Sequence, residues 1–342
     1  MDASSWHGAN LPPQRWQHVL TTEQLAELGR VADTLKGCNL ATVTDAPLSG
    51  SLAELMRLVR SELLSGCGLA LLRGMPVVEW GVPRCTAAFY ALGLALGSPV
   101  PQNAAGHLLG HVRDNGSDPA KPETRLYTTA AAQPWHTDSA DLVGLCCLRQ
   151  SDSGGASRVC CSTAVYAHLV ATQPAHAAQL MQPFAWDRKG EIPAGCEPWF
   201  PMPVFTTAPG GRVVSMYDRS FITAAQTRLR GAGVPALTAS QAAALDSADT
   251  AADALAVSMR LQPGDIQWLH SHTTWHARDA FADDAGRSQR HLLRLWLAPP
   301  ADLAWPLPAG FAVRYGSVAA DAQPPRGGIR VPGVVPCAPV EE

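Results

Sequence analysis

The strongest constraint on the fold is a succession of short apolar segments that begins near residue 97. Gly, Pro, Asp and Ser separate these segments, and this pattern is typical of short β-strands joined by turns. Many such strands in one chain predict a sandwich or barrel, so we expect a mainly β core over about residues 97–298. The expected strands are residues 143–148, 159–161, 213–217, 266–270 and 291–297.

Helices are expected on both sides of this core in the sequence. Residues 21–35 and 51–64 carry apolar side chains at helical spacing, and each begins with a capping box. A buried strand follows at 69–72, and a third helix is expected at 83–96. The Ala-rich residues 238–259 predict a helix inserted between strands.

The whole chain is expected to form one domain, because neither a repeat nor a long linker divides it. Residues 1–96 would form an N-terminal helical segment before the β core. The tail, residues 299–342, is rich in Pro and Gly and is expected to wrap the surface.

Charge and composition exclude several classes of protein. The formal net charge is −3 and the Lys and Arg residues form no tract, so neither nucleic acid nor an anionic membrane is an expected partner. No apolar run reaches the roughly 18–20 residues of a membrane span, and the start does not resemble a secretory signal. Nine cysteines without a C-x-x-C pair predict free or buried thiols in a reducing cytosol. A cytoplasmic location is therefore expected.

A candidate metal site lies in the sequence Trp135-His136-Thr137-Asp138. Residues two apart on a strand share a face, so the His136 ring and the Asp138 carboxylate can reach one point. Two imidazoles and one carboxylate suit a ferrous ion and leave open coordination positions. The pair alone is weak evidence, since a chance surface pair explains most such spacings.

A third ligand would have to come from far along the chain. His276 lies 140 residues after His136, just beyond the expected strand at 266–270. His270 and His272 are competing candidates. A hydrogen-bonded structural histidine is also an adequate explanation for any one of them.

Arg294 adds context to these histidines. Its period-2 neighbours are Leu292 and Trp296, and Leu also stands on either side of it in the chain. A guanidinium on so apolar a strand is expected to be at least partly buried and to need an anion. That anion is either an internal Asp or Glu, or a substrate carboxylate held by two nitrogens.

Together these motifs resemble the taurine dioxygenase-like (TauD/TfdA-type) branch of the Fe(II)/2-oxoglutarate dioxygenases. The resemblance spans roughly residues 66–298 and rests on three segments in a fixed order. These are residues 135–138, residues 153–157 with 164–166, and residues 263–266 with 276–278, Arg290 and Arg294.

The resemblance implies a fold and a set of ligands. The fold would be a double-stranded β-helix (jelly roll). His136, Asp138 and His276 would bind Fe(II). Arg294, 18 residues after His276, would pair with the far carboxylate of 2-oxoglutarate, with Arg290 and Ser157 nearby. Ser157 stands where the family usually has Thr. Asp138 is kept, whereas halogenating relatives lose this carboxylate.

The implied reaction oxidises an unactivated C–H bond with O2 and 2-oxoglutarate and releases succinate and CO2. Hydroxylation, desaturation or cyclisation of a small polar metabolite is expected, with an amino acid or amino-acid-derived acid as the default substrate. Polar candidates for holding it are Asn103, His107, Asp141 and Arg219, although surface loops explain such residues equally well.

Other functions are less well supported by the sequence. The chain lacks H-E-x-x-H, G-x-S-x-G and a P-loop, the signatures of zinc proteases, serine hydrolases and nucleotide enzymes. The alternative that stays open is a non-catalytic small-molecule-binding jelly roll. Trp135 and Trp275 flank two of the ligands and either shield the site or belong to the core. The oligomeric state is not predicted.

Overall fold

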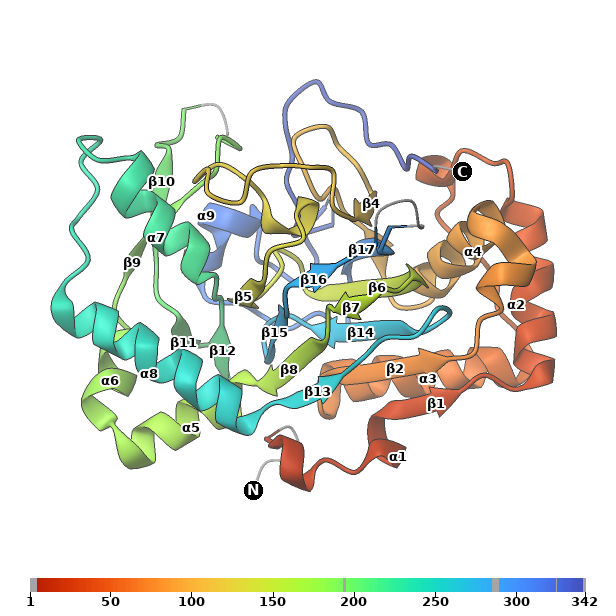
Figure 1. The fold of residues 1–342 in the computed structure, drawn as a ribbon, viewed down its shortest axis with the longest axis horizontal. Helices are drawn as coiled ribbons and strands as arrows, with labels where there is room; N and C mark the ends of the chain where they lie inside the picture. Colours follow the sequence, from red (N-terminus) through yellow and green to blue (C-terminus); the bar gives the residue numbers. More distant parts are fainter. Residues whose placement is uncertain (1–4, 193–194, 285–288, 324, 341–342) are drawn as a thin grey trace.

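The computed structural model describes residues 5–192, 195–284, 289–323 and 325–340. Within them, two β-sheets pack against each other and helices cover their outer faces (Figure 1). The protein is therefore a mixed helix-and-strand fold built around a β core.

The larger sheet runs in the order β1-β2-β14-β6-β17-β3, and β4 also pairs with β17. The expected strands at 69–72, 143–148, 266–270 and 291–297 all lie in this sheet. Its strands are β1 (Gln17–Val19), β2 (Leu69–Arg73), β3 (Ser98–Pro99), β4 (Leu109–Val112), β6 (Leu142–Arg149), β14 (Ile266–His270) and β17 (His291–Ala298).

Strand β17 shows why this sheet is apolar on both faces. Leu293, Leu295 and Leu297 pack against the covering helices. Leu292 and Trp296 point the other way, into the core between the two sheets. Arg294 has the same parity as Leu292 and Trp296, so its side chain also enters the space between the sheets.

Three helices cover the outer face of the larger sheet, on the right of Figure 1: α2 (Thr22–Leu35), α3 (Gly50–Ser65) and α4 (Val77–Leu94). The first two agree with the expected helices at 21–35 and 51–64. The third begins at Val77 rather than at residue 83. Gly81 has a φ of 70° and kinks the helix, so Pro83 stands in the first turn after the kink, where proline is tolerated.

The smaller sheet has the order β13-β8-β15-β5. Its strands are β5 (Gln133–His136), β8 (Ser157–Cys161), β13 (Val257–Met259) and β15 (Thr274–Arg278). The prediction of one helix over 238–259 was wrong at its end. Helix α8 (Ala239–Leu255) stops before residue 257, and residues 257–259 instead pair with the edge of β8.

Helices and hairpins cover the outer face of the smaller sheet, on the left of Figure 1. The helices are α5 (Ser162–Thr172), α6 (Pro174–Leu180), α7 (Arg219–Arg228) and α8. The hairpins are β9 (Phe184–Asp187) with β10 (Trp199–Met202), and β11 (Phe205–Thr207) with β12 (Val213–Ser215). Strand β12 ends at Ser215, two residues before the expected end at 217. A further short pair joins β7 (Ser153–Gly154) to β16 (Phe281–Ala282).

The C-terminal tail does more than wrap the surface. It forms η4 (Ala309–Phe311) and α9 (Ala312–Tyr315), and the side chains of Phe311 and Tyr315 join the core beside the smaller sheet. Arg314 and Arg326 of the tail are also buried. The sequence did not predict these buried residues, because single buried side chains in a Pro- and Gly-rich segment form no periodic pattern.

Two further expectations concern cysteines and membranes. No disulfide joins any of the nine cysteines in the described part of the chain. Among the described helices, none combines the length and the apolar composition that crossing a membrane requires.

Candidate metal centre

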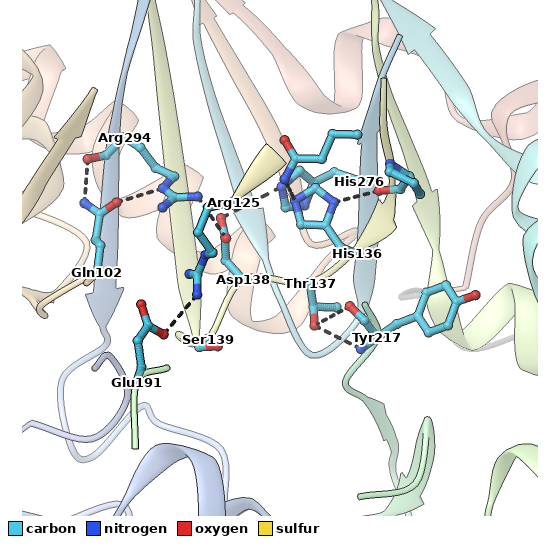
Figure 2. A network of polar contacts seen from close by, with 12 residues as sticks. Gln102, Arg125, His136, Thr137, Asp138, Ser139, Glu191, Tyr217, His276 and Arg294 are labelled. Carbon is cyan, nitrogen blue, oxygen red and sulfur yellow. Dashed lines mark hydrogen bonds and ion pairs between the residues drawn. The ribbon is translucent and has the colours of Figure 1, made fainter. Parts of the chain in front are cut away.

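His136, Asp138 and His276 come together between the two sheets (Figure 2). His136 ends β5, and His276 lies directly opposite it on the neighbouring strand β15. This register brings the two imidazole centroids to 4.0 Å. One ligand atom from each of the three residues lies within 4.8 Å of the others, and all three residues are buried.

The two competing histidines have other partners. The Nδ1 atom of His270 lies 3.0 Å from the hydroxyl of Thr273. The Nε2 atom of His272 lies 3.2 Å from Oδ1 of Asp141. Of the three histidines considered from the sequence, the structure thus brings His276 to the other two ligands.

The Asp138 carboxylate is the clearest indication of a cation site. Its Oδ1 atom accepts a hydrogen bond from Nη1 of Arg294 at 3.2 Å. Its Oδ2 atom is buried and has no hydrogen-bond partner among the described residues. Burial alone would raise the pKa of this carboxyl, but Arg294, His276 and His136 outweigh it and hold the pKa below its usual value. The carboxylate is therefore ionised and one of its oxygens is available.

The imidazoles are prepared to act as ligands. The Nδ1 atom of His136 lies 2.8 Å from the carbonyl oxygen of Pro134. This contact places the proton on Nδ1 and a lone pair on Nε2, which accepts from the Gln133 amide at 2.9 Å. Burial, followed by the neighbouring His136, lowers the pKa of His276 to about 3, so its ring is neutral. Two neutral imidazoles and an ionised carboxylate fit a ferrous ion.

An inner cavity lies behind the triad, between the sheets. Three arginines line it together with Ser157 and the triad itself: Arg278, Arg290 and Arg294. Among its lining residues Asp138 is the one acid. So many cations in a buried space call for an anionic ligand.

Arg290 has the least compensated guanidinium of the three. It is 4% exposed, and its Nη1 atom has no hydrogen-bond partner among the described residues. Burial lowers its pKa. Arg278 donates from Nη1 to the carbonyl oxygen of Thr129 at 3.1 Å, while its Nε atom is unpartnered within the described chain. Burial and then the charge of Arg290 lower the pKa of Arg278 to about 10.

Arg294 is held on several sides. Its Nε atom donates to Oε1 of Gln102 at 2.7 Å, and its Nη1 atom donates to Asp138. The guanidinium carbon lies 4.7 Å from the Tyr127 ring centroid and 4.9 Å from that of Trp296. Of the two anions expected for Arg294, an internal carboxylate is thus present, and it belongs to the triad.

A second, outer cavity shares His136, Asp138 and Arg294 with the inner one. None of the four residues expected to hold the substrate lines either cavity. Asn103 and His107 contact each other at 3.2 Å within one turn. Asp141 accepts from Nε of Arg326 at 3.1 Å and also contacts His272. Contacts within the protein therefore account for the first three candidates.

Arg219 is similarly occupied. It begins α7 and forms ion pairs with Asp246 and Asp249 of α8, at 2.5 and 2.6 Å. The Tyr217 hydroxyl donates to the same Asp249 at 2.6 Å. This arrangement joins the two helices.

The two tryptophans belong to the core. Trp135 and Trp275 point to the outer face of the smaller sheet, opposite to the ligands beside them. The indole N–H of Trp275 donates to the hydroxyl of Ser215 at 2.9 Å, and its ring stacks on Tyr217 at 4.3 Å. Shielding of the metal is therefore left to other residues.

Sequence reasoning did not select several residues of the site, among them Gln102, Tyr127 and Arg278. Arg278 had a usable signal, because it follows His276 by two residues on one strand and so shares its face. Gln102 lies in irregular chain and Tyr127 in a single 3-10 turn, so neither belongs to a periodic pattern.

Comparison with known proteins identifies a family. The model of the family described as "Taurine catabolism dioxygenase TauD, TfdA family" matches residues 37–296. FR-33289 synthase of Streptomyces rubellomurinus is 31% identical over 306 residues, which cover 86% of this chain and 88% of the synthase. A taurine hydroxylase-like protein, SAT17, of Stachybotrys chartarum is 29% identical over 265 residues, or 75% of this chain and 67% of that protein.

Solved structures share the fold. Asparagine oxygenase in complex with Fe(II), 2S,3S-3-hydroxyasparagine and succinate superposes with a TM-score of 0.61 at 19% identity, covering 82% of this chain and 93% of its own. The non-heme iron oxygenase OrfP in complex with Fe and alpha-ketoglutaric acid gives 0.60 at 17% identity, with the same coverages of 82% and 93%.

Proposed function

Since this chain belongs to the TauD, TfdA family of Fe(II)/2-oxoglutarate-dependent dioxygenases, we propose that it oxidises an unactivated C–H bond of a small polar metabolite. Membership of the family confirms the expected enzyme class and the two expected cofactors, Fe(II) and 2-oxoglutarate. It also favours an enzyme over a non-catalytic binding protein. The outcome we propose is hydroxylation, desaturation or cyclisation of an amino acid or amino-acid-derived acid.

The observation that carries the proposal is the unpartnered Oδ2 atom of Asp138 beside two neutral imidazoles. His136, Asp138 and His276 would hold the iron. Arg294 positions the carboxylate: by holding Oδ1, it leaves Oδ2 facing the two rings. When bound, iron and 2-oxoglutarate would supply the activation of O2, which is the oxidant, with conversion of 2-oxoglutarate to succinate and CO2.

The inner cavity is the proposed place for 2-oxoglutarate. Arg290, Arg294 and Ser157 would contact the co-substrate, and Arg278 adds a third positive charge to the same wall. A dianion compensates the buried cations, and a planar guanidinium binds a carboxylate through two nitrogens. Both arginines remain candidates for the far carboxylate. Arg290 is the better candidate for this carboxylate, because its Nη1 atom has no partner among the described residues, whereas Arg294 already donates a hydrogen bond to Asp138.

The two packed sheets support the proposal that residues 97–298 form a jelly roll within one domain. Strands β1 and β2 of the N-terminal segment extend the larger sheet at its edge. The inner faces of both sheets contribute to one core cluster, which the triad adjoins.

The substrate class is supported by what the structural relatives bind. Asparagine oxygenase and OrfP were solved with 3-hydroxyasparagine and (3S)-hydroxy-L-Arg. Amino acids and their acidic derivatives are therefore the first compounds to test. The substrate would approach from an outer cavity that shares His136, Asp138 and Arg294 with the inner one.

The test is a screen of such compounds for succinate formation by the iron-loaded enzyme. One chemical class should stimulate succinate release, and omission of Fe(II) should abolish it. A protein that binds no iron when purified without oxygen would refute the proposed function.

A further inference from the structure

The outer cavity contains a group of cations that the metal site does not use. Arg125 and Arg314 line this cavity together with His136 and Asp138. Arg125 precedes η3 (Leu126–Thr128), whereas Arg314 lies in α9 of the tail. Arg314 lies outside the residues that match the family model, 37–296.

Three cations surround one aromatic ring. The Phe221 centroid lies 5.3 Å from the guanidinium carbon of Arg125, 5.2 Å from Nζ of Lys189 and 5.9 Å from the guanidinium carbon of Arg314. The negative face of a ring attracts a cation, but it does not neutralise three of them. Like charges brought so close are stable only when an anion offsets their repulsion.

The acid supplied by the protein is shared. Among the described residues, no aspartate contacts Arg125 or Arg314 directly. Glu191 pairs with both arginines through one oxygen, and Figure 2 shows its contact with Arg125. Its Oε2 atom lies 2.9 Å from Nη1 of Arg125 and 3.8 Å from Nη2 of Arg314. The second distance is beyond a hydrogen bond.

The excess of positive over negative charge around Phe221 is costly because the groups are buried. The side chain of Arg314 is 4% exposed, and that of Glu191 is 11% exposed. Burial lowers the pKa of Arg314 to about 10, so the group is still a cation at neutral pH. Two further acids, Asp218 and Asp187, act on Lys189 through their charge. Asp218 lines the cavity, but its Oδ1 atom caps α7 through the Ser220 and Phe221 amides, and Asp187 is paired with Arg228.

We propose that Arg125 and Arg314, with Lys189 beside them, bind an oxyanionic head group of the prime substrate, either a carboxylate or a tetrahedral oxyanion. This inference rests on the proposed function and names the substrate class of that site. The anion would lie against Phe221 and Ser139, whose hydroxyl accepts from Nε of Arg314 at 2.9 Å. The rest of the substrate would then extend toward His136 and Asp138.

Glu191 has a definite role in this arrangement. It compensates the arginines when no substrate is bound, and it competes with the substrate anion for them. Its removal should therefore strengthen anion binding, whereas removal of either arginine should weaken it. A purely structural ion cluster would not respond to these two changes in opposite directions.

The experiment uses calorimetric titration of the Fe(II)-loaded enzyme without oxygen, with 2-oxoglutarate saturating so that the inner cavity is filled. Acetate and inorganic phosphate are the anionic probes, and acetamide and methylammonium are the neutral and cationic ones. We expect an anion to bind, and the better of the two probes identifies a carboxylate or a tetrahedral head group. Binding of methylammonium alone, or of no probe, would overturn the inference.

Variants locate the site. Arg125→Gln and Arg314→Gln should each weaken the bound anion about tenfold, which corresponds to about 1.4 kcal/mol. Glu191→Gln should tighten it. Arg84→Gln is the control, because Arg84 of α4 forms an ion pair with Asp33 of α2 at 2.7 Å, lines neither cavity and should leave binding unchanged.

Failure of this inference can be told apart from failure of the proposed function. Iron content and 2-oxoglutarate affinity are measured on the same samples, and neither depends on Arg125 or Arg314. Normal values for both, together with anion binding that the variants leave unchanged, would mean that the cation group is structural. Loss of iron or co-substrate binding in the unmodified enzyme would count against the proposed function instead.

Discussion

Replacing Arg290 by Lys should weaken 2-oxoglutarate binding while leaving iron binding near that of the unmodified enzyme. Arg290 lies within the inner cavity, and its Nη1 atom has no partner among the described residues. Lysine keeps the charge but offers a single point of contact in place of the planar fork. Losing one charge-assisted hydrogen bond costs about 1.5–3 kcal/mol, or roughly ten- to a hundredfold in Kd.

The measurement is calorimetric titration of the Fe(II)-loaded enzyme with 2-oxoglutarate without oxygen. Arg294→Lys is titrated in parallel, and the larger of the two losses identifies the arginine at the far carboxylate. Arg158→Lys is the control, because Arg158 points away from the cavity and pairs with Asp253 at 2.5 Å and Asp279 at 3.3 Å. Unchanged affinity in both test variants would refute the placement of 2-oxoglutarate in this cavity.

Four further predictions address other parts of the molecule. Asp138→Ala should reduce bound iron from about one per chain to near none without unfolding the protein, measured by metal analysis and circular dichroism; full iron content would contradict the ligand set. Because Asp138 is present, reactions in chloride buffer should give no chlorinated product by mass spectrometry. Gly144→Ala should lower the free energy of unfolding by about 1–3 kcal/mol, since its Cβ would lie 2.2 Å from the Trp268 ring, and an unaffected denaturation midpoint would show that the ring can move aside. Burial, followed by the neighbouring His272, lowers the pKa of His270 to about 3, and burial, followed by His111, lowers the pKa of His291 to about 4. Below about pH 6.5 both histidines are protonated in the unfolded chain but not in the folded one. As the pH falls from 6 toward 4, each histidine should therefore lower the free energy of unfolding by about 1.4 kcal/mol per pH unit. Denaturation midpoints that do not change over this range would contradict the prediction.

The strands could be predicted because they are short apolar runs bounded by Gly, Pro, Asp and Ser. Arg294 illustrates this, since its apolar neighbours on both faces predicted a buried guanidinium, and the structure places it between the sheets at 5% exposure. The elements that were predicted less well lack such a pattern. Residues 257–259 follow an Ala-rich helix directly, and only the exposed edge of β8 makes them a strand.

The metal ligands could be proposed from the sequence, but the choice among histidines needed the family context. His270, His272 and His276 are all buried within or beside two successive strands. What separates them is the register of β15 with β5, which sets His276 opposite His136. Register depends on pairing between segments more than a hundred residues apart, and no local pattern encodes it.

The residues proposed to bind iron and co-substrate and those proposed to bind the substrate come from different kinds of segment. Strands β5, β15 and β17 carry His136, His276 and Arg294, so three of the residues proposed to hold iron and co-substrate lie on paired backbone, and Asp138 and Arg290 lie within two residues of a strand end. Arg125 and Glu191 lie instead in irregular segments, and Arg314 in a single helical turn of the tail. Because these loops pack on the core without forming it, their charges can change while the register of the strands stays intact. Substitutions at Arg125 or Glu191 should therefore alter which substrates are oxidised and leave iron content as it is, whereas substitutions on the strands should affect every substrate alike.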